Sequence, residues 1–213
     1  MGRRVGRAAF AALPLVFLVA CTDEPPAPPP DQNAAVIVPG KPGEPGTVVP
    51  SQDAAKHQQT PQPNDADVNY MTMMIPHHQQ AIVMTDLVAD HDAGPVVRAI
   101  AGRIAAAQGA EITVMTQWLT GYGKAPDAHA HHGDHAMPGM ATPQQLDALR
   151  AARGPEFDRQ FLALMITHHE GAVTMARQQL AQGVEPRAQE MAQDVITGQT
   201  AEIERMRAAQ QPG

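Results

Sequence analysis

The sequence has very few aromatic residues and a single cysteine. Phe, Trp and Tyr together make up 3% of its 213 residues, so a hydrophobic core must be built mainly from Ala, Leu, Ile, Val and Met. Such a core suits closely packed helices better than sheets, in which aromatic residues are favoured. Because Cys21 is the only cysteine, an intrachain disulfide is excluded.

Several motifs that would identify an enzyme or a common metalloprotein are also missing. Serine is scarce, and no glycine-rich phosphate-binding loop or nucleophile–base arrangement is apparent. No Glu-x-x-His motif occurs, which disfavours a di-iron centre in a helical bundle. The chain also has no Asp-rich loop with the glycine and terminal glutamate of a calcium site.

Positive charge is in short supply. The chain has 15 Lys and Arg residues against 22 Asp and Glu residues, a net charge of −7 with His neutral. Without the N-terminal Arg3, Arg4 and Arg7 the net charge is about −10. This balance disfavours nucleic acid and anionic membrane surfaces as partners, and it is compatible with cations.

The N-terminus resembles a leader for export. The three arginines precede an apolar stretch from Ala8 to Ala20, which is too short for a permanent membrane-spanning helix. Leu18-Val19-Ala20-Cys21 resembles a bacterial lipobox, which implies that residues 1–20 are a signal peptide and that Cys21 carries a lipid. An ordinary secretory signal is the alternative. The predicted location is the extracytoplasmic side of the cell envelope, with a lipid anchor as the only membrane contact.

Residues 21–64 are rich in proline, glycine and polar residues. A segment of this composition buries too little apolar surface to fold. We therefore predict a lipidated, disordered tether that holds a domain at some distance from the membrane.

Helical periodicity begins near Asp65 and continues to Ala209. It predicts long helices over about 68–91, 95–119, 155–182 and 186–209 and a short helix over 143–152. Glycines follow several of these segments and prolines begin them, in keeping with helix ends and first turns. Pro76 lies inside the first helix, where we expect a kink rather than a break.

One phrase of sequence occurs twice, 91 residues apart. Met74-Ile75-Pro76-His77-His78 corresponds to Met165-Ile166-Thr167-His168-His169, and the same offset pairs Gln108, Glu111 and Met115 with Gln199, Glu202 and Met206. A register kept over about 40 residues indicates a duplicated unit. Because one amphipathic hairpin cannot bury its apolar face alone, we predict an all-α four-helix bundle of two duplicated hairpins over residues 65–209.

The repeated phrase places candidate metal ligands on one sector of each helix. Helical spacing groups Met74, His77, His78 and Met84 in the first copy and Met165, His168, His169 and Met175 in the second. Methionine at this spacing is usually core filler. Two adjacent histidines flanked by methionines are costly as packing, however, and their recurrence favours a role as ligands.

Auxiliary ligands are present on the partner helices and in the linker. The candidates are Met73, Glu111, Met115, Glu202 and Met206, together with His129, His131, His132, His135, Met137 and Met140 in the linker over residues 124–142. This linker resembles the Met- and His-rich segments of copper-handling proteins. We predict that it is irregular and flexible and that it captures metal weakly.

The ligand types indicate copper. Imidazole combined with thioether suits Cu(I), and imidazole-rich sites suit Cu(II), Zn or Ni. Copper in either oxidation state is therefore the predicted metal, and another divalent metal is left open.

The phrases at 74–84 and 165–175 resemble the domain-of-unknown-function 305 family, over about residues 65–209 of this chain. The resemblance implies a ferritin-like helical bundle, and some members are associated with copper binding and copper resistance. Carried onto this sequence, the motif residues are Met74, His77, His78, Met84, Met165, His168, His169 and Met175. The first copy has Gln80 where the second has Gly171, so we do not expect two equal sites.

Together these features predict a copper-binding lipoprotein outside the cytoplasm, for metal sequestration, delivery or resistance. It would act with a copper-handling partner protein or as a homo-oligomer. One alternative is a copper-dependent redox enzyme resembling a cuprous oxidase. Another is a metal-free structural or interaction bundle whose histidines are hydrogen-bonded core residues. Redox cycling with turnover would indicate the enzyme, and tight Cu(I) binding without turnover would indicate the binding protein. Absence of any bound metal would indicate the structural bundle.

Overall fold

The computed structural model describes residues 34–39, 45–57, 61–125 and 137–211, and the chain divides into two compact units, residues 1–58 and 59–213. The predicted signal peptide and lipidated Cys21 lie outside the described residues. Among the helices that are described, none is long and apolar enough to cross a membrane.

The first unit contains local structure that the proline-rich composition did not predict. Strands β1 (Ala35–Val38) and β2 (Thr47–Pro50) pair antiparallel, and helix α1 (Ser51–His57) follows directly. Both strands consist largely of β-branched residues, which favour a pleated strand even within a segment rich in proline. Val38 and Val49 are buried on the hairpin. Residues 35–57 of the predicted tether thus contain short elements of regular structure.

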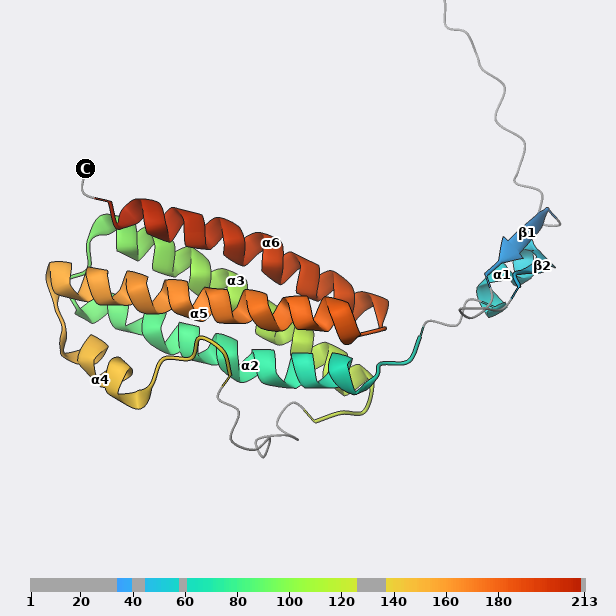
Figure 1. Ribbon diagram of the computed structural model, residues 1–213, viewed down its shortest axis with the longest axis horizontal. Coiled ribbons are helices and arrows are strands. Elements are labelled where there is room, and N and C mark those ends of the chain that lie inside the picture. The colour runs from blue at the N-terminus through green and yellow to red at the C-terminus, as the bar shows by residue number, and fades with distance from the viewer. Residues whose placement is uncertain (1–33, 40–44, 58–60, 126–136, 212–213) are drawn as a thin grey trace, which may run out of the picture. The chain divides into compact units, whose positions relative to one another are not determined.

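The second unit is a bundle of four long helices, as predicted. They are α2 (Asp65–Asp86), α3 (Pro95–Gly121), α5 (Gly154–Gln182) and α6 (Pro186–Ala209), with the 3-10 turn η1 (Leu87–Asp90) after α2 and the short helix α4 (Pro143–Ala151) before α5. Helices α2 and α3 form one hairpin, and α5 and α6 form the other. The connection between the hairpins returns along the bundle, so α5 runs antiparallel to α2 (Figure 1). One long crossover of this kind is typical of ferritin-like bundles.

The helix ends follow from local sequence. Asn64 begins α2 with a capping box that it forms with Asp67, and Thr142 begins α4 in the same way with Gln145. Helices α3, α4, α5 and α6 each have proline in the first turn, where its missing N–H leaves no hydrogen bond unmade. Helix α2 continues through Pro76 without a break.

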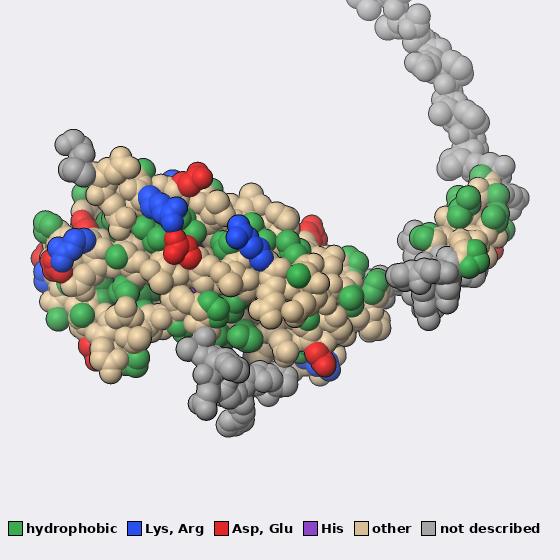
Figure 2. All heavy atoms as spheres, viewed as in Figure 1, with side chains coloured by type: hydrophobic (Ala, Val, Ile, Leu, Met, Phe, Trp, Pro, Cys, Tyr) green, Lys and Arg blue, Asp and Glu red, His purple; other side chains and the backbone are tan. Residues whose placement is uncertain are grey.

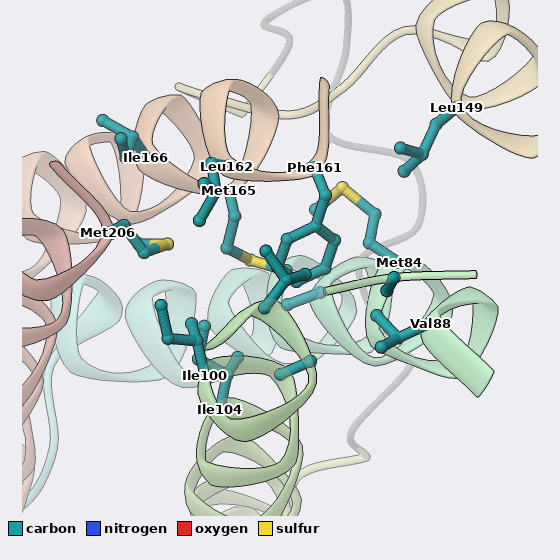
Figure 3. Packing of buried hydrophobic residues seen from close by; sticks show 14 of the residues in the cluster. Met84, Val88, Ile100, Ile104, Leu149, Phe161, Leu162, Met165, Ile166 and Met206 are labelled. Carbon is teal, nitrogen blue, oxygen red and sulfur yellow. The ribbon is translucent and has the colours of Figure 1, made fainter. Parts of the chain in front are cut away.

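The buried side chains form two clusters along the bundle axis. The Met84 cluster includes Met84, Met165, Met206, Phe157 and Phe161, and it draws residues from all four long helices and from Leu149 of α4 (Figure 3). The Met74 cluster includes Met74, Met115, Met175, Met191 and Trp118. Methionine fills both clusters in place of the scarce aromatic residues, as its flexible side chain allows.

Two aspartates join the hairpins at opposite ends of the bundle, and they are 91 residues apart. Asp67 of α2 accepts hydrogen bonds from the backbone N–H groups of Val184 and Glu185 at the start of α6, each at 3.2 Å. Asp158 of α5 accepts from the N–H of Gly94 at the start of α3. Each hairpin thus supplies a carboxylate to a helix N-terminus of the other, where negative charge is favoured.

The bundle carries exposed charged side chains of both signs. On the face drawn in Figure 2, basic and acidic side chains are interspersed. Several form exposed pairs within one helix turn, such as Arg150 with Asp147. Exposed pairs of this kind contribute little to stability, so the bundle depends on its interior and on the two aspartates.

Candidate metal centre

The histidine doublets of the two copies meet at the middle of the bundle. His77 and His78 of α2 and His168 and His169 of α5 are all fully buried, at 0% exposure. Because α2 and α5 are antiparallel, the two doublets lie opposite each other, and the rings of His77 and His168 have their centroids 3.8 Å apart. The duplicated phrase therefore forms one contiguous histidine group.

The outer histidine of each doublet is paired with a carboxylate of its own hairpin. His78 Nε2 lies 2.5 Å from an oxygen of Glu111 on α3, and His169 Nε2 lies 2.9 Å from an oxygen of Glu202 on α6. Both pairs span 33 residues, so the duplication preserves the contact as well as the sequence. The candidate glutamates are thus hydrogen-bond partners of imidazoles.

The inner histidines are bonded to backbone carbonyls. His77 Nε2 lies 2.9 Å from the carbonyl oxygen of Pro138, and His168 Nε2 lies 2.8 Å from the carbonyl oxygen of His77. A carbonyl oxygen only accepts hydrogen bonds, so Nε2 must carry the proton in both rings. Burial lowers the pKa of His77 to about 4 and that of His168 to about 2. Both rings are therefore neutral at pH 7, with the lone pair on Nδ1.

The Nδ1 atoms of all four central histidines are buried and have no hydrogen-bond partner among the described residues. Histidines that bind metal commonly donate the other ring N–H to a carboxylate or a backbone carbonyl, which fixes the ring and raises its basicity. The central group has this arrangement four times. His91 has a similar pattern, with Nε2 bonded to the Arg150 carbonyl, but its ring packs on Phe157 rather than on another histidine.

Methionines flank the histidines on both sides, and each cluster combines the two copies. Met74 of the first copy shares a cluster with Met175 of the second, and Met165 shares the other cluster with Met84. These four methionines are all buried, as are Met115 and Met206. Met73 is half-buried against the Met74 cluster. The packing therefore brings thioethers from both repeats to each side of the imidazoles.

Nitrogen and oxygen ligands are not gathered around a single point. In the part of the chain that the structure describes, no group of three or more His, Cys, Asp or Glu side chains is arranged to hold a metal ion. A site that combined one or two imidazoles with thioethers would suit a soft, low-coordinate ion such as Cu(I).

The end of the linker is ordered, which corrects the prediction of flexibility throughout residues 124–142. Pro138 and Gly139 lie against Gly171 of α5, while Ala141 exchanges two hydrogen bonds with the side chain of Gln80 on α2. Met137 packs against the Met74 cluster, and Met140 is half-buried. The predicted ligands His129, His131, His132 and His135 lie outside the described residues.

Sequence reasoning missed two further polar groups in the interior. Gln108 of α3 and Gln199 of α6 are buried, and neither side-chain amide has a partner among the described residues. They lie one turn before Glu111 and Glu202. Their match at the 91-residue offset was the sequence signal that could have identified them as part of the central region. Unpaired buried amides are costly, so the region around the histidines is more polar than a simple core.

The family model described as "Domain of unknown function (DUF305)" matches residues 67–210. The chain belongs to this family. A DUF305 protein from Streptomyces coelicolor, which is predicted to be secreted, is 29% identical and has a TM-score of 0.61, covering 66% of this chain and 89% of its own. A DUF305 fragment from Deinococcus radiodurans is 27% identical with a TM-score of 0.62, covering 70% and 97%. These similarities confirm the helical bundle.

The protein CopM is a third structural relative. Its Cu(II)-bound form is 33% identical, with a TM-score of 0.58, and covers 67% of this chain and 93% of its own. CopM structures with Cu(I) and with Ag are also similar to this chain. No curated protein sequence is significantly similar. Relatives of this DUF305 chain thus include a protein solved with soft metal ions.

Proposed function

We propose that this DUF305 protein binds copper as cargo, outside the cytoplasm, for sequestration or delivery. The observation that carries the proposal is the central histidine group, in which four buried imidazoles have Nε2 engaged and Nδ1 unpartnered. An unpaired buried acceptor is costly, and a metal ion would satisfy it.

The methionines support copper over harder metals. Met74, Met84, Met165 and Met175 are buried in the clusters on either side of the histidines. Thioether ligands select Cu(I), and CopM was solved with Cu(I), Cu(II) and Ag. We propose the motif histidines with these methionines as the ligand set.

The proposal is tested by replacing the central histidines in the purified full-length protein. The variant with His77, His78, His168 and His169 all changed to Ala should lose tight Cu(I) binding in competition with a chromogenic chelator, and circular dichroism should show that the helices remain. His91→Ala is the matched control, because His91 is also buried with an unpartnered Nδ1 but stands apart from the group. Equal Cu(I) affinity in all three proteins would mean that the histidines are core residues.

The rival functions give different outcomes in the same preparation. A redox enzyme would consume O₂ with repeated turnover when supplied with Cu(I), whereas a binding protein would take up a fixed amount. A structural bundle would bind neither oxidation state tightly.

We further propose that the bundle is tethered to a membrane by lipid on Cys21. The support is the leader-like sequence of residues 1–21. Mass spectrometry of the envelope form should show residues 1–20 removed and a diacylglycerol adduct on Cys21. Cys21→Ser should then release the protein from the membrane fraction.

A further inference from the structure

The segment Met137–Ala141 crosses the bundle beside the histidines and connects the two clusters. At one end Met137 packs against the Met74 cluster, and at the other end Ala141 is buried in the Met84 cluster. Between them the carbonyl oxygen of Pro138 lies 2.9 Å from His77 Nε2. This crossing segment therefore supplies the hydrogen-bond partner of one central imidazole.

The residues that hold the crossing segment are one of the pairs at which the two copies differ. Gln80 donates from its side-chain amide to the Ala141 carbonyl at 2.9 Å and accepts from the Ala141 N–H at 2.7 Å. Its counterpart at the 91-residue offset is Gly171, where a Cβ atom would overlap the carbonyl of Pro138. The glutamine clamps the segment from α2, and the glycine leaves space for it on α5.

Backbone conformation adds to the fit. Gly139 has a φ of 79°, a backbone conformation that residues other than glycine rarely adopt. A Cβ atom there would approach the Cα of Gly171 to 3.0 Å. Two glycines from distant parts of the chain thus allow backbone to pack on backbone directly beside the histidine group.

The crossing segment makes the two doublets unequal. His77 depends on Pro138 for its Nε2 partner, whereas His168 uses the carbonyl of His77 within the bundle itself. Only the first copy therefore needs an element outside the four helices to fix its tautomer. An outer partner of this kind is worth about 10–100-fold in metal affinity.

We propose that Gln80 and Gly171 are positioning residues of the metal centre. They place the crossing segment so that the Pro138 carbonyl holds the proton of His77 on Nε2 and leaves Nδ1 to bind metal. The inference rests on the proposed copper binding for its effect on affinity, while its effect on His77 belongs to the metal-free protein. It makes copper binding through His77 dependent on the crossover and copper binding through His168 independent of it.

The test uses Gln80→Ala and Gly171→Ala in the purified full-length protein. Gln80→Ala removes both hydrogen bonds to Ala141, and Gly171→Ala adds a methyl group where Pro138 lies. Gly198→Ala on α6 is the control for the glycine, because its Cβ would meet nothing within 4 Å. Gln193→Ala, on the exposed face of α6, is the control for the glutamine.

Two measurements separate this inference from the proposed function. In the metal-free protein, imidazole ¹⁵N chemical shifts report the tautomer of each histidine. Both test variants should shift the His77 signals toward a tautomer mixture and leave His169 unchanged. In a Cu(I) competition titration, both variants should weaken the binding step that involves His77 by about tenfold. The binding step that involves His168 should match that of the control variants.

The outcomes that overturn the proposal are specific. If His77 keeps its wild-type ¹⁵N shifts in both test variants, the crossing segment does not set its tautomer. If the shifts change but both Cu(I) steps match the controls, the segment does not position the metal centre. Failure of the wild-type protein to bind copper would refute the proposed function, and the His77 shifts would still decide whether Gln80 and Gly171 set the tautomer.

Discussion

The two copies of the repeat have the same secondary structure but different surroundings. His78 and His169 each meet a glutamate of their own hairpin at the same sequence separation. The inner histidines differ, because His77 is bonded to the crossover and His168 to the first copy. Duplication thus preserved the contacts within each hairpin and left the contacts between hairpins free to diverge.

The cross-hairpin aspartates show the same divergence. Asp67 is fully buried and accepts hydrogen bonds from four groups, those of Asn64, Gln179, Val184 and Glu185. Asp158 is half-buried and accepts from Gly94 alone among the described residues. The end of the bundle that Asp67 joins should therefore contribute more to stability than the end that Asp158 joins.

Acidification should have the largest effect, and it should separate His77 from His168. The unfolded chain takes up protons on these histidines below pH 6.5. The folded chain does so only near pH 4 at His77 and near pH 2 at His168, because both are buried. The folded metal-free protein should hence be most stable above pH 7 and lose about 5 kcal/mol between pH 7 and pH 4.5.

Urea unfolding of single variants can assign this loss. His78 and His169 are present in the wild-type protein and in each single variant. The difference between a variant and wild type at each pH therefore reports the replaced histidine. His77→Gln should flatten the pH dependence mainly between pH 6.5 and pH 4. His168→Gln should flatten it down to about pH 2. Identical pH slopes in wild type and both variants would show that the inner histidines do not control acid stability.

Replacing the two cross-hairpin aspartates should cause the next largest loss of stability. Asp67→Ala leaves several buried donors unpaired and should lower the free energy of unfolding by about 3 kcal/mol. Asp158→Ala loses one backbone partner and should cost about 1 kcal/mol. Denaturant unfolding at pH 7 measures both values, and equal losses would remove the proposed difference between the two ends.

The glutamates that hold the outer histidines should have a smaller effect, on metal rather than on folding. Glu202→Gln should weaken Cu(I) binding by about tenfold, since a neutral amide supports the His169 ring less well. Glu111→Gln should have a smaller effect, because the Glu111 side chain is 32% exposed and that of Glu202 only 12%. The chelator competition used above checks this order, and unchanged affinity in both variants would exclude a supporting role.

The smallest effect is expected at a position where the copies already differ. Met73 has Leu164 as its counterpart, and both are half-buried against a cluster. Met73→Leu should leave the Cu(I) stoichiometry unchanged and alter stability by less than about 1.5 kcal/mol. Loss of a copper equivalent in this variant would instead make Met73 a ligand.

Much of the fold was predictable because its signals are local. Helix bounds follow from periodicity, caps and first-turn prolines, and the 91-residue register reveals two hairpins. The hairpin β1–β2 was missed because composition averaged over residues 21–64 hides two short β-branched runs.

The centre was predictable only in part. Spacing identifies the doublets, but it cannot show that Met74 shares a cluster with Met175, because that depends on how the hairpins pack. The bond from His77 to a carbonyl 61 residues away has no sequence signature, since any residue supplies a carbonyl. The sequence shows that Gln80 and Gly171 differ at matching positions of the two copies. The reason for the difference appears only in the structure, where the crossing segment contacts both residues.

The sharing of each methionine cluster between the copies bears on how such a chain could arise. A single ancestral hairpin would have completed the centre only as a symmetric homodimer, in which every contact occurs twice. In that homodimer a substitution appears in both subunits, so glutamine on one side and glycine on the other could not coexist. The contrast between Gln80 and Gly171 is therefore possible only in a single covalent chain, where one connection lies beside one histidine pair and the two halves can carry different residues.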